Sequence, residues 1–305
     1  MFFSNLRKQS AKDKARLDEA VGKPPGEQAI TQGRPSDVAV VKGPSKPPAE
    51  EADRTLRCRC EMKYLISEAK ADAVAQYIKS FIKLDRYSRL RRTGSYPIVS
   101  LYLDSDDLRL CRESLTGKKN RFKLRIRGYT DEPDYPSFFE IKRRINTVIL
   151  KARARVMHHD VQTLLAGLPL PPQNYHVDME TLNQFQLYMS SIQAKPMILI
   201  RYMRQAYEGG DDNRVRITFD RELCYKVTHR PEVMLGGGGW QYNSITLGGG
   251  VILEIKFTAR FPAWISRMAA YFGLQQQSIS KYATSITQAC SLGYCAPYLE
   301  GVEYG

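Results

Sequence analysis

The feature that most constrains the fold is a charged residue at every second position of several predicted β-strands. The motif Glu-x-Lys occurs three times in such stretches, at Glu61-Met62-Lys63, Glu140-Ile141-Lys142 and Glu254-Ile255-Lys256. Side chains of a strand alternate between the two faces of its sheet, so the Glu and the Lys of each motif point to the same side. The sequence therefore predicts a sheet with one strongly ionic face.

Other stretches show the same alternation with basic residues alone. In residues 121–127 and 151–155, Lys or Arg occupies every odd position and an apolar residue every even position. An antiparallel sheet with one face in water also alternates apolar and polar residues, so a solvated surface is one explanation. Solvated faces usually mix uncharged polar residues with charges of both signs, whereas Lys and Arg dominate here. If the strands close into a barrel with this face inward, such a concentration of positive charge is tolerable only around a polyanion and a metal ion.

The rest of the sequence predicts one folded domain behind an N-terminal arm. Residues 1–55 are rich in Pro, Lys and Ala and poor in aromatic residues, a composition typical of a disordered or loosely attached segment. This arm holds 10 Lys or Arg against 8 Asp or Glu, so about +12 of the total charge of +14 belongs to the remaining chain. We expect the folded domain over residues 56–290 and a C-terminal tail over residues 291–305.

The positive charge of this domain predicts an anionic partner: nucleic acid, anionic lipid or a phosphate-rich small molecule. The sequence contains no helix-turn-helix, zinc-finger or aromatic RNA-binding motif, so we expect no nucleic-acid partner. It also contains no apolar run of signal-peptide length and none near the ~20 residues of a membrane span. These observations predict a soluble, cytoplasmic protein.

Cysteine usage and helical patterns complete this outline. The six cysteines agree with a reducing compartment, and Cys58 and Cys60 alternate with charged residues. We expect these two residues to lie on the apolar side of the first strand, in the core, rather than at a zinc site. No second pair of cysteines has metal-binding spacing. Apolar spacing and capping residues predict four helices covering the outer face of the barrel, starting near Ser67, Asp178, Pro262 and Ser280.

A series of short blocks resembles a known family. In order along the chain they cover residues 61–64, 100–104, 107–108, 123–129, 139–142, 201–207, 214–220, 253–257 and 280–282. These blocks are similar to the VTC domain of polyphosphate polymerases, within the triphosphate tunnel metalloenzyme (CYTH-like) superfamily. One Glu-x-Lys motif is weak evidence, but this many blocks in the right order is strong evidence. Relatives often show an aromatic and a further basic residue where this chain has residues 111–114, and Arg112 is the candidate there.

The resemblance implies an α+β fold with a closed antiparallel β-barrel tunnel of about eight strands and flanking helices. It implies that the basic lining holds ATP and polyphosphate, with Mn²⁺ or Mg²⁺ as cofactor. The implied catalytic residues are Lys63, Arg125, Arg127, Lys142 and Lys281. The implied substrate-binding residues are Lys123, Lys151, Arg201, Arg204, Arg216, Lys256 and Ser280, and Arg121 is a further candidate. The implied metal ligands are Glu254 first, then Glu140 and Glu61.

These residue types suit phosphoryl transfer, which depends on positioning and charge neutralisation more than on covalent catalysis. The resemblance implies a polymerase that transfers the γ-phosphoryl group of ATP to a polyphosphate chain. A triphosphatase of the same fold and a polyphosphate-binding module without turnover are the alternatives, because all three share the same binding residues. A carboxylate at Glu254 argues against the binding module, since capturing a polyanion needs no carboxylate in a basic channel.

Overall fold

The structure of the protein is a computed structural model. It describes residues 59–294 except residues 147, 171, 172, 174, 175, 210–214, 259 and 260. The predicted N-terminal arm and most of the predicted C-terminal tail lie outside these residues, as does Cys58.

The described residues form strands that are mostly long and helices that are mostly short. The strands are β1 (Arg59–Ser67), β2 (Lys83–Leu84), β3 (Tyr96–Asp104), β4 (Arg121–Gly128), β5 (Pro136–Ile145), β6 (Val148–Met157), β7 (Lys195–Glu208), β8 (Arg216–Val227), β9 (Gln241–Tyr242) and β10 (Gly250–Thr258). The helices are α2 (Glu68–Ile78), α3 (Arg86–Arg89), α4 (Arg109–Leu115), α5 (Val161–Leu165), α6 (Met179–Ser191), α7 (Ala263–Tyr271) and α8 (Lys281–Ser291), with a 3₁₀ turn, η2, at His158–Asp160.

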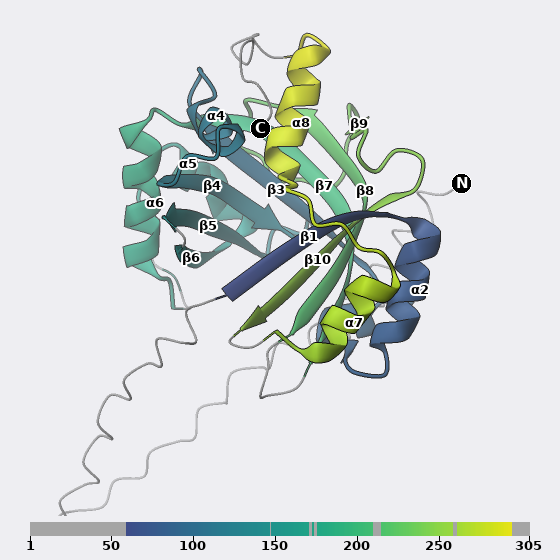
Figure 1. The fold of residues 1–305 in the computed structure, drawn as a ribbon. Helices are drawn as coiled ribbons and strands as arrows, with labels where there is room; N and C mark the ends of the chain where they lie inside the picture. The colour runs from purple at the N-terminus through teal and green to yellow at the C-terminus, as the bar shows by residue number, and fades with distance from the viewer. Residues whose placement is uncertain are drawn as a thin grey trace, which may run out of the picture. The chain divides into compact units, whose positions relative to one another are not determined.

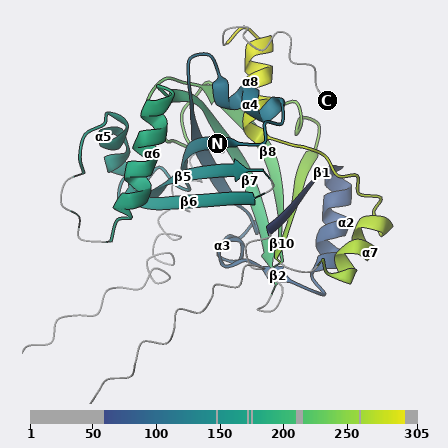
Figure 2. The same ribbon diagram turned by 60° about the vertical axis from the view of Figure 1, so that its left-hand side comes forward.

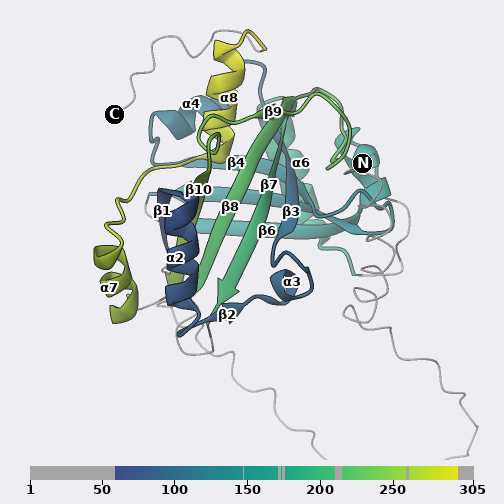
Figure 3. The ribbon, with the colours of Figure 1, turned by 90° about the vertical axis from the view of Figure 1, so that its right-hand side faces the viewer.

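All the strands belong to one antiparallel sheet in the order β1-β10-β8-β7-β3-β4-β5-β6, with the short β2 and β9 paired to β7 and β8. The α+β class, the antiparallel pairing and the flanking helices of the prediction are confirmed. Closure of the barrel is not, because within the described residues β1 and β6 do not pair and form the two edges of the sheet. The sheet twists strongly, as antiparallel sheets do: Figure 3 shows β4, β5 and β6 running across the steep β7 and β8.

Helices cover the outer face of the sheet in two groups. Near one edge, α2 and α7 bury Val74, Ile78 and Ile265 against Phe219 and Leu253 of strands β8 and β10. Near the other edge, α5 and α6 pack on β4, β5 and β6 (Figures 1 and 2). Burial of this apolar face fixes which side of every strand is free for charged residues.

Helix α8 departs from the prediction that helices cover only the outer face. Its residues Tyr282 and Ile286 pack against Tyr102, Ile198 and Ile200, which point to the inner face of the sheet. Together with α4 it covers one end of the inner face, as Figure 1 shows at the top of the view. The rest of that face carries the ionic side chains.

The predicted helix starts agree with the structure to within one residue. The side chains of Ser67, Asp178 and Ser280 cap α2, α6 and α8 by accepting hydrogen bonds from backbone N–H groups of the first turn, and Pro262 immediately precedes α7. No helix of the described residues is long and apolar enough to cross a bilayer.

Two cysteines differ from the prediction. Cys60 pairs with Phe257 on the apolar side of β1, as expected, but lies exposed near the beginning of the strand and is not a core residue. Cys290, near the end of α8, is disulfide-bonded, which departs from the expectation of reduced cysteines.

Candidate functional site

Strand register brings the predicted ionic residues together on the inner face of the sheet. Lys63 lies opposite Glu254, Arg125 opposite Glu140, and Arg204 opposite Asp220. By the same alternation, this face holds Glu61, Lys123, Arg127, Lys142, Lys151, Arg153, Arg216 and Lys256.

This face is concave, because side chains from opposite ends of the sheet meet across it. The Lys142 Nζ on β5 lies 3.6 Å from Glu61 Oε2 on β1, although many strands separate β1 from β5 in the sheet. The Lys123 Nζ on β4 donates to Ser280 Oγ at 3.0 Å, and Lys63 Nζ on β1 donates to the Ile279 carbonyl at 2.8 Å. The ionic side chains therefore line a concave face, called the channel below, although β1 and β6 do not pair among the described residues.

A dense ionic cluster forms at the centre of the channel, where α8 begins. The Arg204 guanidinium donates to both oxygens of Asp220 at 2.7 and 2.8 Å, and Lys281 Nζ lies 2.7 Å from the same carboxylate. Burial raises the pKa of Asp220, but Arg204 and Lys281 outweigh it and hold the pKa at about 2. Arg204 also lies 3.8 Å from Glu254, so the cluster extends to β10. The N-terminus of α8 adds a partial positive charge here.

A second cluster surrounds Glu140 on β5. Its carboxylate contacts Arg125 at 2.6 Å, Arg153 at 3.4 Å and Arg127 at 3.8 Å. Burial raises the pKa of Glu140, yet the three guanidinium groups lower it to about 2. Arg125 also donates to Tyr102 Oη at 3.1 Å. Glu140 thus orients several arginines.

Glu61 and Glu254 make up the part of the site that fits a metal ion. Lys256 Nζ lies 2.5 Å from Glu254 and 3.9 Å from Glu61, and so bridges the two carboxylates. Among the described residues no group of three or more His, Cys, Asp or Glu side chains is placed to hold a metal ion. Mg²⁺-type sites, however, often use one or two carboxylates together with substrate phosphates, and this pair fits such a set. Glu140 is held by arginines instead.

Lysines near one end of the channel lack enough carboxylate partners. Burial, followed by the charges of Lys142 and Lys63, lowers the pKa of Lys123 to about 7. Burial, followed by Lys256 and Lys142, lowers the pKa of Lys151 to about 8. Repulsion between these cations would be relieved by a bound polyanion.

Several buried polar atoms of the inner face have no hydrogen-bond partner among the described residues. They are Arg127 Nε, Ser100 Oγ and Thr218 Oγ1. Ser100 lies directly opposite Arg127, and Thr218 directly opposite Glu254. Buried polar groups are rarely left unpaired, so these atoms are available to a ligand.

Some residues predicted for the site lie elsewhere. Arg201 points to the outer face of β7, where it donates to the Leu235 carbonyl and stacks on Trp240 with 4.3 Å between guanidinium and ring. Arg216 is on the inner face, but Asp85 at 2.7 Å and Glu208 at 3.2 Å already neutralise it. Arg112 on α4 pairs with Asp107.

Sequence reasoning missed three inner-face residues of this site. Strand alternation could have identified Asp220, because Arg216, Thr218 and Asp220 occupy every second position of β8 and share one face. Tyr202 has Lys281 and Arg204 over its ring, at 4.9 and 5.3 Å from the centroid. Tyr102 stacks on Tyr282 of α8 at 4.8 Å. The two tyrosines could not be found from charge alternation, because they are uncharged.

Several solved structures are similar to this chain at low sequence identity. A putative adenylate cyclase from Bacillus halodurans is 14% identical over 72% of this chain and 92% of that chain, with a TM-score of 0.41. The PH1819 protein from Pyrococcus horikoshii is 12% identical over 75% and 98%, with a TM-score of 0.38. The putative adenylyl cyclase HpAC1 from Hippeastrum, described as having a dominant triphosphatase activity, is 13% identical over 78% and 97%, with a TM-score of 0.39. At these values the likeness carries no argument about activity.

No curated protein matches the chain. The sequence model of the VTC domain family, in contrast, matches residues 58–290, which include every strand from β1 to β10 and nearly all of α8. The chain therefore belongs to the VTC domain family, and this membership supports an enzymatic function that involves triphosphate or polyphosphate.

Proposed function

We propose that this protein is a metal-dependent polyphosphate polymerase that transfers the γ-phosphoryl group of ATP to the end of a polyphosphate chain. The observation that carries the proposal is the concave ionic face, on which Arg125, Arg127, Arg204 and Lys281 converge from two strands and a helix. Buried donors without partners among the described residues line the same face. The cytoplasmic location and the domain boundaries expected from the sequence remain predictions.

In this proposal the arginines hold the phosphates and the reaction is a simple displacement. An oxygen of the terminal acceptor phosphate forms a bond to the γ-phosphorus of ATP, the bond from that phosphorus to the β–γ bridging oxygen breaks, and ADP leaves. Arginine binds phosphate oxygens in a fixed, bidentate geometry, whereas lysine supplies a point charge. The acceptor phosphate is already ionised near neutral pH, so the transfer needs no strong base.

Metal chemistry would be supplied beside Glu254 and Glu61. Mn²⁺ or Mg²⁺ held there with phosphate oxygens would neutralise charge on the transferred group. For the carboxylates to bind an ion, Lys256 must release Glu254, and Lys63 and Lys142 must release Glu61. A phosphate chain offers these lysines a replacement anion. Hydrolysis is the second candidate function, since Glu61 lies beside an open cavity from which water can reach the site.

Product analysis separates the candidate functions. Purified protein is incubated with ATP and Mn²⁺, and the products are resolved by gel electrophoresis and chromatography. Long-chain polyphosphate with ADP supports the polymerase, free orthophosphate supports the hydrolase, and binding without turnover supports the binding module.

The variant Glu254→Gln tests the metal site. We expect it to abolish metal-dependent turnover, because the amide cannot supply the carboxylate charge, while circular dichroism shows an intact fold. Glu180→Gln is the matched control, since Glu180 is an exposed residue of α6, on the outer face of the sheet. Unchanged turnover of Glu254→Gln would remove this residue from the metal site.

A further inference from the structure

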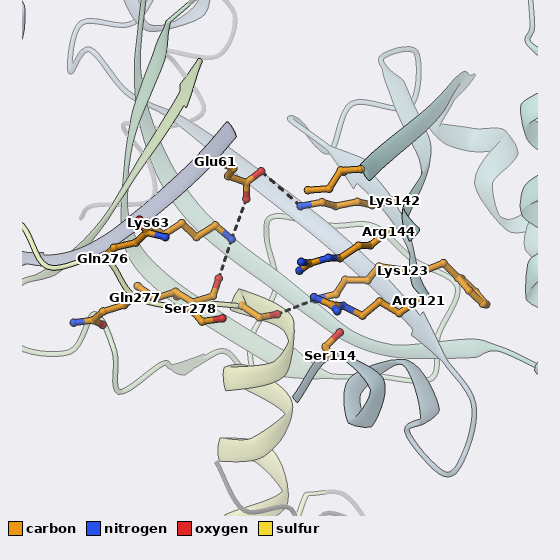
Figure 4. Close-up of a pocket in the computed structure, with 14 residues that line it drawn as sticks. Glu61, Lys63, Ser114, Arg121, Lys123, Lys142, Arg144, Gln276, Gln277 and Ser278 are labelled. Carbon is orange, nitrogen blue, oxygen red and sulfur yellow. Dashed lines mark hydrogen bonds and ion pairs between the residues drawn. The ribbon is translucent and has the colours of Figure 1, made fainter. Parts of the chain in front are cut away.

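A cavity of about 550 Å³ opens where the ionic face reaches the β1 edge of the sheet. Its lining includes five basic residues, Lys63, Arg121, Lys123, Lys142 and Arg144, against a single carboxylate, Glu61. Figure 4 shows the side chains from β4 and β5 pointing toward Lys63 and Ser278. The cavity is therefore lined for a ligand that carries several negative charges.

The outer end of this cavity carries a pair of arginines that face each other. Arg121 on β4 lies directly opposite Arg144 on β5. Like charges directly opposite each other destabilise a sheet, and burial followed by Arg144 lowers the pKa of Arg121. Among the described residues neither guanidinium forms an ion pair with a carboxylate; they contact the carbonyls of Lys118 and Asn146. Such a pair is suited to an anion bound between the two guanidinium groups.

These arginines continue the row of cations that begins in the channel. Arg127, Arg125, Lys123 and Arg121 occupy four successive inner positions of β4, over a length of about 20 Å at the usual rise of a strand. This length is much greater than that of a triphosphate group. A single triphosphate therefore cannot contact all four residues of the row, and the outer residues are free to bind further phosphates.

The opposite end of the same row is mainly aromatic, and the Arg153 guanidinium lies 3.6 Å from the centroid of the Phe138 ring there. Arg127 lies beside Phe138, and Phe138 contacts the Tyr129 ring, with 5.9 Å between centroids. Tyr129 in turn contacts Tyr96 at 6.3 Å. Arg153 at this end is therefore engaged by an aromatic ring, whereas Arg121 and Arg144 line an open cavity.

We propose that Arg121 and Arg144 form an outer subsite for the distal phosphates of a polyphosphate chain, so that the protein binds long chains more tightly than tripolyphosphate. This inference rests on the proposed function, because it assumes that the central channel binds phosphates. It assigns the cavity to the polyphosphate rather than to the nucleoside of ATP. Arg144 is an exposed residue outside the central channel, and none of the family blocks in the sequence includes it.

The double variant Arg121→Gln/Arg144→Gln tests this subsite by isothermal titration calorimetry with tripolyphosphate, long-chain polyphosphate and ATP. We expect its Kd for the long chain to rise roughly tenfold, because charge-assisted contacts are lost, while its Kd for tripolyphosphate stays unchanged. Arg143→Gln is the matched control: Arg143 is the neighbour of Arg144 on β5 but faces outward and donates to Tyr188 Oη at 3.2 Å. We expect it to change neither Kd.

A long chain can bind in many registers, which lowers its Kd for the wild type and the variant alike. The ratio of the two Kd values for each ligand cancels this statistical effect. Equal losses for both inorganic ligands, no loss for either, or a loss for ATP alone would overturn the subsite. The single variant Arg144→Gln repeats the test if the double variant does not fold. Assays of polymer synthesis on the same preparations separate the two proposals: a selective loss of long-chain binding without synthesis by the wild type supports the subsite and contradicts the polymerase.

Discussion

At the scale of single residues, the channel lysines make phosphate binding depend on pH. The pKa of Lys123 is about 7 and that of Lys151 about 8, chiefly because of burial and then of neighbouring cations. A bound polyanion stabilises the charged ammonium groups and raises both pKa values. Binding therefore takes up protons at neutral pH, and we expect the affinity for tripolyphosphate to fall as pH rises from 7 to 9.

Calorimetry in buffers with different ionisation enthalpies measures this proton uptake directly. The variant Lys123→Gln should show less uptake than the wild type, whereas Lys195→Gln, which changes an exposed lysine paired with Asp106, should not. Proton release on binding in this pH range would contradict the assignment of Lys123 and Lys151 to the phosphate site.

Arginines on opposite faces of the sheet offer a second test. We expect Arg127→Ala to weaken tripolyphosphate binding by about 1–3 kcal/mol, because a buried charge-assisted contact is lost. Arg201→Ala removes the same side chain from the outer face and should leave the affinity unchanged. If the two variants bind equally well, the inner face is not where phosphate binds.

The placement of Arg201 shows what residue patterns could and could not predict. Arg201 and Arg204 are an odd number of positions apart, so strand alternation already separated them, although the family block contains both. The ionic face itself followed from the same alternation. The contacts of Glu140 with three arginines, however, depend on which strands are neighbours in the sheet. The residue pattern within a single strand does not predict that order.

At the scale of elements, a buried hydrogen bond helps to hold α8 in place. Tyr282 Oη donates to Asp104 Oδ2 at 2.5 Å, and Asp104 also accepts from the backbone N–H groups of Leu110 and Cys111 at the start of α4. This contact joins α8, which carries Lys281, to β3 and α4. It holds the N-terminus of α8 at the ionic cluster.

The variant Tyr282→Phe should lower the free energy of unfolding by about 1–3 kcal/mol, because a buried carboxylate loses a partner. Tyr271→Phe, which changes a 79% exposed residue of α7, should leave it unchanged. Urea denaturation of both variants measures the difference. Equal stability of Tyr282→Phe and wild type would show that this hydrogen bond does not secure α8.

Sequence patterns predicted the long elements better than the short ones. The strands and the helices capped by Ser67, Asp178 and Ser280 carry strong periodicity and capping signals. Helices α3 and α5 are only four and five residues long, too short for helical periodicity to show. The inner-face position of α8 was also missed. An amphipathic pattern predicts that a helix packs against the sheet, but it does not predict which face of the sheet the helix covers.

At the scale of the whole molecule, the protein carries excess positive charge at the expense of stability. The unfolded chain has ordinary lysines with pKa values near 10.5, whereas folding lowers the pKa of Lys123 to about 7 and that of Lys151 to about 8. At pH values between the folded and the unfolded pKa, the unfolded chain binds more protons than the folded protein. The free energy of unfolding therefore rises with pH in this range. We expect the ligand-free protein to be more stable at pH 9 than at pH 7.

Urea denaturation at the two pH values measures this difference. The variant Lys123→Met should reduce the pH dependence, because it removes one of the groups whose pKa changes on folding. Greater stability of the ligand-free wild type at pH 7 would contradict the predicted crowding of cations in the channel.

The most direct test of the central claim is a crystal structure of the protein soaked with tripolyphosphate and Mn²⁺, with anomalous diffraction to locate the metal. The account predicts phosphate density on the inner face, in contact with Arg125, Arg127, Arg204 and Lys281, and an anomalous peak beside Glu254. Phosphate density confined to the outer face, with the inner ion pairs unchanged, would contradict it.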